Sequence, residues 1–327
     1  MTIPSTLVQV TQIGVEATPG TAVAANKLLQ AVEIVPSIKG NVQSFRPRGS
    51  KFPTLAALGK DWTEARISGQ AVYTDIVYLL AGILGYAEPA KQGESAAYKW
   101  TFTPAQNAED SIKTFTVECG SATRAGRFAY GLVNSFGLSF DRDKVELSGA
   151  MLGRAYEDDI TLTASPTAID PVPIQPTELA LYIDDKAADV GKTQIEAEAL
   201  QGSFEIGDRF GAVWPINSSL ASFGSHVETV PTATLKLFLA ANDIGMGPLA
   251  AMRAGAKRWI RIAATGPVAD DTHHYSLQLD LCGTVSEVGE SSDRDGVYAL
   301  EWTFQATHDA TWEKALTVAV VDKLSEL

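Results

Sequence analysis

The sequence predicts a mainly β protein of the α+β class, made of two similar domains in tandem. Most of the chain alternates apolar and polar residues, as half-buried strands do. Only one helical pattern occurs in each half, and a proline-rich segment divides the chain almost at its middle. A length of 327 residues also suits about two domains of about 150 residues each. We therefore expect a first domain at 1–165, a linker at 166–177 and a second domain at 178–327.

The two halves repeat one order of elements. Each half contains a strand, a long loop, a second strand, a helix closed by glycine, and an Asp-Arg-Asp sequence at a hairpin turn. The first half has extra residues between its helix and its turn, in 87–111. A unit used twice is more typical of a self-assembling protein than of a catalyst with one asymmetric site. In order, the elements are 33–38, 37–60, a strand ending near Ala71, 76–85 and 141–143 in the first half, and 198–206, 209–231, 232–240, 248–255 and 293–295 in the second.

The helix of the first half has the clearer pattern. Apolar residues in 76–84 recur at the i, i+3, i+4, i+7 and i+8 positions, which predicts an amphipathic helix. Thr74 is expected to cap its start and Gly85 its end. The second helix has fewer apolar residues, but Pro248 suits its first turn and Gly255 its end.

The segment from Thr163 to Thr177 contains four prolines. Proline fixes its own φ and biases the preceding residue toward extended geometry. This composition predicts a stiff, extended linker between the two domains.

The two long loops differ in chemistry. Loops of more than about 12–15 residues are uncommon in compact domains and are often functional. The loop in 37–60 has five basic residues and no acidic one, whereas the loop in 209–231 is aromatic and apolar. A basic arm on a chain with an acidic second half suggests contact between copies, and the alternative is a solvated basic loop. The candidate contact residues are Arg46, Arg48 and Lys51 in the first loop, and Phe210, Trp214 and Phe223 in the second.

The net charge of −13 lies almost entirely in the second half. Residues 1–165 carry 15 Lys and Arg against 16 Asp and Glu, and residues 166–327 carry 11 against 23. Such a chain should not wrap nucleic acid, because that binding relies on cationic side chains that displace counterions. It could instead line a passage through which nucleic acid moves without sticking. The alternative is that the acidity only favours solubility.

Other bulk features point to an ordinary globular chain that folds in a cytoplasm. The longest apolar run, in 76–86, is shorter than the roughly 18–20 residues needed to cross a bilayer. Residues 1–10 lack the basic and apolar regions of a signal peptide. The only two cysteines, Cys119 and Cys282, are expected to be free thiols in strands rather than a metal framework.

The most enzyme-like motif is Gly245-x-Gly247-x-x-Ala250, followed about twenty residues later by Asp270 and Asp271. This pattern matches a dinucleotide fingerprint, in which glycines let backbone N–H groups approach a pyrophosphate. However, one helix per half does not supply the repeated strand–helix units of a parallel sheet. Glycines at a strand-to-helix corner are the simpler interpretation.

No other residues form a catalytic or metal-binding pattern. His273 and His274 are adjacent, so on a strand they would point to opposite faces, and His226 and His308 are isolated. The acidic run 157–159 could attract a cation but is expected to be a solvated charge run. The sequence therefore predicts no enzyme, no cofactor and no metal site.

The stretch from Ile13 to Ala25 reads Ile-Gly-Val-Glu-Ala-Thr-Pro-Gly-Thr-Ala-Val-Ala-Ala. It resembles the start of the tail tube proteins of bacteriophages with long, non-contractile tails, where a Gly-x-Glu-x-x-x-Gly-Thr-Ala-Val-Ala pattern opens the chain. The segments 73–85 and 118–120 are similar to the same family. The resemblance covers most of residues 10–165 and is weaker afterwards.

The resemblance implies two tandem tail-tube-like β-sandwich domains, each with one flanking helix and a long extended loop. Such subunits join into rings that stack into a tube, here as a trimer with pseudo-sixfold symmetry or as a hexamer. It also implies that Arg46, Arg48 and Lys51 lie on an arm that reaches the next ring. The acidic lumen would conduct DNA without binding it, since like charges repel.

The implied partners are other copies of the chain, the tape measure protein, and the tail terminator and tail tip proteins, with no membrane. The implied location is the phage tail of the virion, after synthesis in the host bacterial cytoplasm. Two alternatives remain at this point: another repeated β-rich virion or surface module, such as a capsid decoration protein or adhesin, and a nucleotide-binding enzyme.

Overall fold

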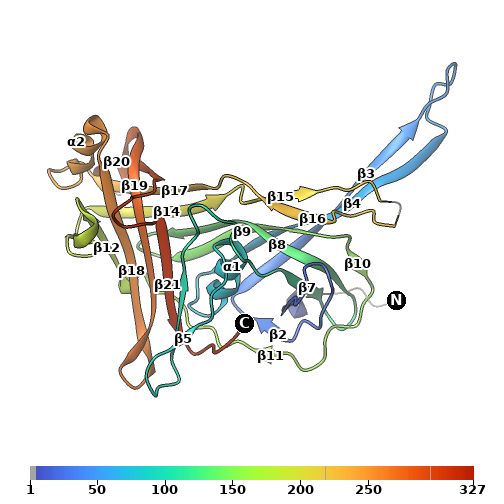
Figure 1. Ribbon diagram of the computed structural model, residues 1–327, viewed down its shortest axis with the longest axis horizontal. Helices are drawn as coiled ribbons and strands as arrows, with labels where there is room; N and C mark the ends of the chain where they lie inside the picture. Colours follow the sequence, from blue (N-terminus) through green and yellow to red (C-terminus); the bar gives the residue numbers. More distant parts are fainter. Residues whose placement is uncertain (1–4, 218, 295) are drawn as a thin grey trace.

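The computed structural model describes residues 5–217, 219–294 and 296–327 (Figure 1). Strands hold 54% of the residues and helical segments 8%, so the predicted mainly β class is confirmed. The elements of residues 1–175 are β1 (Val10–Val15), β2 (Lys27–Leu29), β3 (Val32–Phe45), β4 (Leu55–Gln70), α1 (Asp75–Ile83), β5 (Ala90–Lys91), β6 (Tyr98–Phe102), β7 (Phe115–Gly120), β8 (Ala125–Phe140), β9 (Val145–Gly153), β10 (Glu157–Asp158) and β11 (Thr167–Ala168).

The remaining residues form a second series of strands and one further α-helix. Short 3-10 turns lie at Thr6–Val8, Pro176–Glu178 and Ala187–Asp189. The elements are β12 (Leu179–Asp184), β13 (Gln194–Ile195), β14 (Ala199–Gly207), β15 (Phe210–Val213), β16 (Ser225–Glu228), β17 (Thr232–Ala240), α2 (Gly247–Ala254), β18 (Lys257–Asp270), β19 (His273–Arg294), β20 (Val297–Ala306) and β21 (Leu316–Asp322).

The two halves share their sheets. β8 of the first half pairs with β14 of the second, and β6 pairs with β21, both antiparallel. The expected insertion in 87–111 contains β5 and β6, so its residues extend the sheet of the other half. Buried apolar side chains of both halves form one hydrophobic cluster. The tandem units therefore pack as one body.

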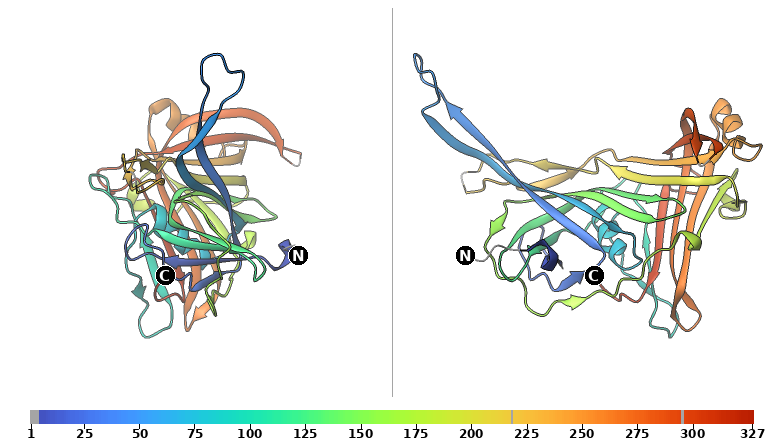
Figure 2. Two further views of the ribbon diagram at one scale, coloured as in Figure 1. Left: turned by 90° about the vertical axis from the view of Figure 1, so that its right-hand side faces the viewer. Right: turned by 180° about the vertical axis from the view of Figure 1, so that it is seen from behind.

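The strand β8 belongs to two layers. Its start pairs with β7 and β10, while its end pairs with β9 and β14. Tyr130 lies near this change and has a positive φ of 57°, which is unusual for a non-glycine residue. The bent strand lets one layer (β1, β2, β7) lie across α1 from the sheet that continues into the second half (Figure 2).

The helix α1 differs from its prediction. All nine of its residues are buried, so it is an interior helix and not an amphipathic surface helix. The positions outside its apolar stripe include Val77, Ala81 and Gly82, and Gly82 leaves space that the Val133 side chain fills. Thr74 does not cap it, because the Thr74 hydroxyl donates instead to the carbonyl of Asp170. In α2 the predicted ends are correct: Pro248 lies in the first turn and Gly255 closes the helix with a φ of 61°.

The proline-rich segment is extended, as predicted, but it is not a free spacer. Ile169 and Ile174 are buried in the core. The Tyr73 amide donates to Val172 and the Ile174 amide donates to Ala71. The segment therefore packs along the first half before β12 begins.

The first predicted long loop is largely strands, and the second contains a short hairpin. Residues 37–60 continue β3 and enter β4, so only 46–54 are a loop, and residues 210–228 contain the β15–β16 hairpin. The first Asp-Arg-Asp sequence is the turn between β8 and β9, where Asp141 accepts hydrogen bonds from the amides of Asp143 and Lys144. In the second, Asp295 lies outside the described residues.

Candidate assembly surface: the β3–β4 arm and its support

The hairpin of β3 and β4 projects from the body as an arm (Figures 1 and 2). β4 pairs with β9 only as far as Thr63, whose partner on β3 is Ile38. From Lys39 to Phe45 the two strands pair only with each other among the described residues, and this stretch is about 24 Å long at 3.4 Å per residue. A two-stranded ribbon of this length buries little of its own surface, so its own strand pairing stabilises it only marginally.

The arm exposes large apolar side chains that nothing in the described chain covers. Val42 lies opposite Leu58 and Phe45 lies opposite Leu55, so both faces of the ribbon are apolar near its end. Phe45, Leu55 and Phe52 are 60%, 68% and 75% exposed. Contiguous exposed apolar residues of this kind mark interaction sites more often than ordinary surface.

The predicted contact residues Arg46, Arg48 and Lys51 all lie at the tip of the arm, in the 46–54 loop. The Arg46 guanidinium donates to the carbonyl of Ser50, which orders the loop. None of the three forms an ion pair with another described residue. We name residues 45–55 the arm tip; it combines exposed aromatic and cationic groups.

The base of the arm is held by the loop between β15 and β16. The indole of Trp214 meets that of Trp62 edge-on at 5.6 Å, and the Lys60 ammonium lies 4.5 Å from the Trp214 ring. The Asp61 amide donates to the carbonyl of Ala221 at 3.1 Å. Aromatic and cation–π contacts of this kind each stabilise by about 0.5–1.5 kcal/mol. The second-half loop therefore fixes the direction in which the first-half arm points.

These contacts correct the prediction for the second loop. Phe210 and Phe223 are buried, and Trp214 is partly buried between Trp62 and Phe223. The rings of Phe210 and Phe223 are therefore covered within the chain, and Trp214 packs against Trp62 and Phe223. The aromatic residues of this loop contact the first half of the same chain.

The N-terminal motif is connected to the loop that supports the base of the arm. The Glu16 carboxylate is buried and accepts four hydrogen bonds, from the amides of Gly20 and Tyr130 and from the hydroxyls of Thr114 and Thr116, at 2.7–3.0 Å. A buried carboxylate needs such donors, since an unpaired charge in the interior is very costly. The motif glutamate therefore has a structural task.

Arg154 connects the N-terminal motif to the loop between β15 and β16, which supports the base of the arm. Its guanidinium donates to the carbonyl oxygens of Gly20, Phe223 and Gly224 at 3.0–3.1 Å and lies over the Tyr130 ring. Gly20 has a φ of 81°, and a side chain there would collide with Arg154 and Tyr130. Sequence reasoning missed Arg154, because a lone arginine after a strand carries no pattern of its own.

A second buried cation joins the halves. Arg209 is only 2% exposed in its side chain and pairs with both Asp110 and Glu228. Its Nε also donates to the Ile83 carbonyl at the end of α1, at 2.9 Å. Burial raises the pKa of Asp110, against the opposing effect of the arginine. Arg209 thus connects α1, the inserted loop of the first half and the β15–β16 hairpin.

The glycines of the dinucleotide-like pattern form a corner. The Gly245 amide donates to the Asn242 side chain, and a Cβ at Gly245 would lie 1.9 Å from the Ala240 carbonyl oxygen. β18 starts just after α2 and ends at Asp270, so the acidic pair lies about 45 Å along the strand from the helix. Figure 1 shows α2 and the β18–β19 turn at opposite ends of the sheet. The acidic pair and the glycines therefore do not meet in one site.

Several of the other candidate residues make structural contacts. Within the acidic run, Glu157 pairs with Arg127, and Asp158 pairs with Arg124. His226 contacts the Tyr130 hydroxyl at 3.0 Å, and burial lowers its pKa. Both cysteines are free and lie in strands, as predicted. Across the described part of the chain, no cluster of three or more His, Cys, Asp or Glu side chains could hold a metal ion.

A scan against protein-family models found no match for this chain. A search of curated proteins found no significant match either. Among the described residues, no helix has the length and apolar character to cross a membrane.

Proposed function

We propose that this protein is a structural virion subunit that assembles into stacked rings and forms the tail tube of a bacteriophage with a long, non-contractile tail. The observation that carries the proposal is the β3–β4 arm. It is a long ribbon with exposed apolar faces and a cationic tip, and it is rigidly oriented at its base. Exposed apolar surface of this kind marks a site of interaction with another chain or a risk of aggregation.

The acidic second half would give the proposed tube a negative charge. Residues 166–327 carry 23 acidic and 11 basic residues, so a ring of several copies would carry a large negative charge. DNA phosphates passing such a wall would be repelled rather than held. In this proposal the protein is not an enzyme and has no cofactor, and it meets the tape measure, tail terminator and tail tip proteins in the virion.

The test is electron microscopy of the concentrated protein in negative stain. We expect rings or tubes from the native chain, and folded protein that does not stack into tubes from the variant R46E/R48E/K51E. The matched control K91E/K99E/R142E makes the same change in net charge at exposed positions away from the arm. It should assemble as the native chain does.

Two results would count against the proposal, and a third would count against the role of the arm tip. A native chain that remains monomeric, even with tail initiator proteins present, would exclude ring stacking. Particles that bind capsids without forming tubes would instead indicate a decoration protein. Tubes of unchanged length from the tip variant would remove the role of the three cations.

A further inference from the structure

A groove of about 840 Å³ opens where the two halves meet. Its lining comes from the end of α1, the inserted loop 104–109 and strands of the second half. Leu84, Ile206 and Leu316 give it buried apolar walls, and the exposed residues Val230 and Glu109 lie at its rim. A volume of this size lies within the range of about 300–1,000 Å³ that holds bound side chains or ligands.

The groove is negatively charged. Arg209 and Glu228 line it, and Asp110 pairs with Arg209. One cation and two carboxylates leave a net charge of −1 in this buried cluster, and the exposed Glu109 adds another negative charge. A partner that fits the groove should therefore combine apolar groups with positive charge.

The arm tip has this composition. Phe45, Phe52 and Leu55 are exposed, and Arg46, Arg48 and Lys51 surround them without an acidic residue between 34 and 60. Aromatic and arginine side chains are also the residues that most often dominate binding at protein interfaces. We propose that this groove receives the arm tip of a second copy of the chain. This inference rests on the proposed function and names the surface that the arm would contact.

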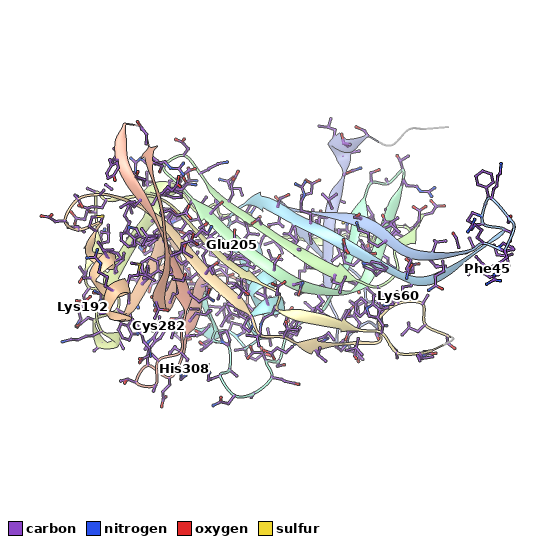
Figure 3. All side chains as sticks on the ribbon, turned by 90° about the horizontal axis from the view of Figure 1, so that it is seen from above. Phe45, Lys60, Lys192, Glu205, Cys282 and His308 are labelled. Carbon is purple, nitrogen blue, oxygen red and sulfur yellow. The ribbon has the colours of Figure 1, made fainter. Side chains whose placement is uncertain are left out.

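The tip of one chain does not fill the groove of the same chain. The arm points away from the body (Figure 2), and Figure 3 places Phe45 at one end of the molecule and His308, which lines the groove, toward the other. The donor and acceptor surfaces are therefore different parts of one chain. In a heterologous contact of this kind, every pair of copies still has one unoccupied arm tip and one unoccupied groove. Further copies can therefore add at both ends.

The test uses two variants that each lose one side of the contact. The tip variant is R46E/R48E/K51E, and the groove variant is E109K/V230R, which changes only exposed rim residues and leaves the Arg209 cluster intact. Neither variant alone should form tubes. An equal mixture should form larger particles than either variant alone, since the intact tip of one variant fits the intact groove of the other. Light scattering after size-exclusion chromatography measures this mass.

A peptide assay separates this inference from the proposed function. A cyclised peptide spanning residues 43–57 should bind the tip variant, whose groove is intact, and bind the groove variant about tenfold or more weakly, as measured by fluorescence anisotropy. The control E94K/V268R makes the same kind of change at exposed positions outside the groove, and it should retain peptide binding and assembly. Unchanged melting temperatures would show that all variants fold.

The outcomes decide between the two proposals. If the native chain forms tubes and the groove variant forms them equally well, the groove is not the acceptor and the tail tube proposal stands. If the native chain forms no tubes but the peptide binds the groove selectively, the contact is real and the tube is not. Equal peptide binding to the groove variant and the control would overturn the inference.

Discussion

Asp322, at the end of β21, should make the protein less stable as the pH rises. Its side chain is fully buried, and its Oδ1 accepts hydrogen bonds from the Trp100 indole at 3.0 Å and the Leu324 amide at 2.9 Å. Its Oδ2 has no partner among the described residues. Burial is the dominant effect and raises the pKa of Asp322 from 3.8 to about 7, although both hydrogen bonds act in the opposite direction.

The direction of this pH effect follows from the protonation of Asp322 in the folded and in the unfolded chain. Below about pH 4 the carboxyl is protonated in both the folded and the unfolded protein, and its contribution to stability is fully present. Between about pH 4 and 7 only the unfolded chain releases the proton, so the free energy of unfolding falls with each step in pH. A change in pKa from 3.8 to about 7 corresponds to about 4 kcal/mol of lost stability.

The variant D322N should remove most of this loss. The amide carbonyl of asparagine can accept the same hydrogen bonds from Trp100 and Leu324, but asparagine does not ionise. We expect the variant to unfold at higher urea concentration than the native chain at pH 8, by up to about 4 kcal/mol in unfolding free energy, and to lose this advantage at pH 4. Tryptophan fluorescence during urea unfolding, at protein concentrations that keep the chain monomeric, measures both values.

A matched control is D143N, at an exposed position in the β8–β9 turn. It should leave the difference between the pH 4 and pH 8 stabilities unchanged. If D322N and the native chain show the same dependence on pH, Asp322 is not protonated in the folded protein near neutral pH and the reasoning is wrong. Asp75, whose burial raises its pKa to about 6, is present in both proteins and does not affect the comparison.

Two further predictions concern the contacts between the halves. W214A should lower the free energy of unfolding by about 2 kcal/mol and speed hydrogen exchange at the Asp61 amide, because the base of the arm loses its aromatic support; exchange as slow as in the native chain would mean that the arm is held without Trp214. R209M should cost about 3–5 kcal/mol in thermal unfolding by leaving Asp110 and Glu228 buried without a cation, and adding D110N and E228Q should restore part of it. No recovery in the triple variant would show that the loss came from packing rather than charge.

The sequence located the arm but could not give its form. The run of basic residues without an acid marked 37–60 as unusual, yet β3 continues through Gly40, Asn41 and Ser44, which are poor strand formers. Both faces of the ribbon are exposed, so no alternation between buried and exposed positions distinguishes it from a loop. The pairing with β4, which supplies the strand geometry, connects residues that only the turn at 46–54 brings together.

For α1 the sequence predicted the helix and its position, but not its burial. A stripe of large apolar residues shows that one face of the helix is buried. It does not show whether the opposite face meets solvent or a second sheet. In the structure small residues on the opposite face let β8 approach closely, as at Gly82 and Val133. The cap at Thr74 failed for a related reason, because the proline-rich segment offered a carbonyl that the local sequence does not show.

The sequence by itself determined what depends on neighbouring residues: the β class, the place of both helices, the turn at the first Asp-Arg-Asp sequence, the free cysteines and the uneven charge. The tertiary structure alone decided what depends on contacts across the halves. Trp62 meets Trp214 and Arg209 meets Asp110 across more than 90 positions of chain, and such pairings leave no periodic trace in either segment. The sequence therefore shows the arm as a basic segment. Its direction depends on contacts with a loop that lies more than 150 residues further along the chain.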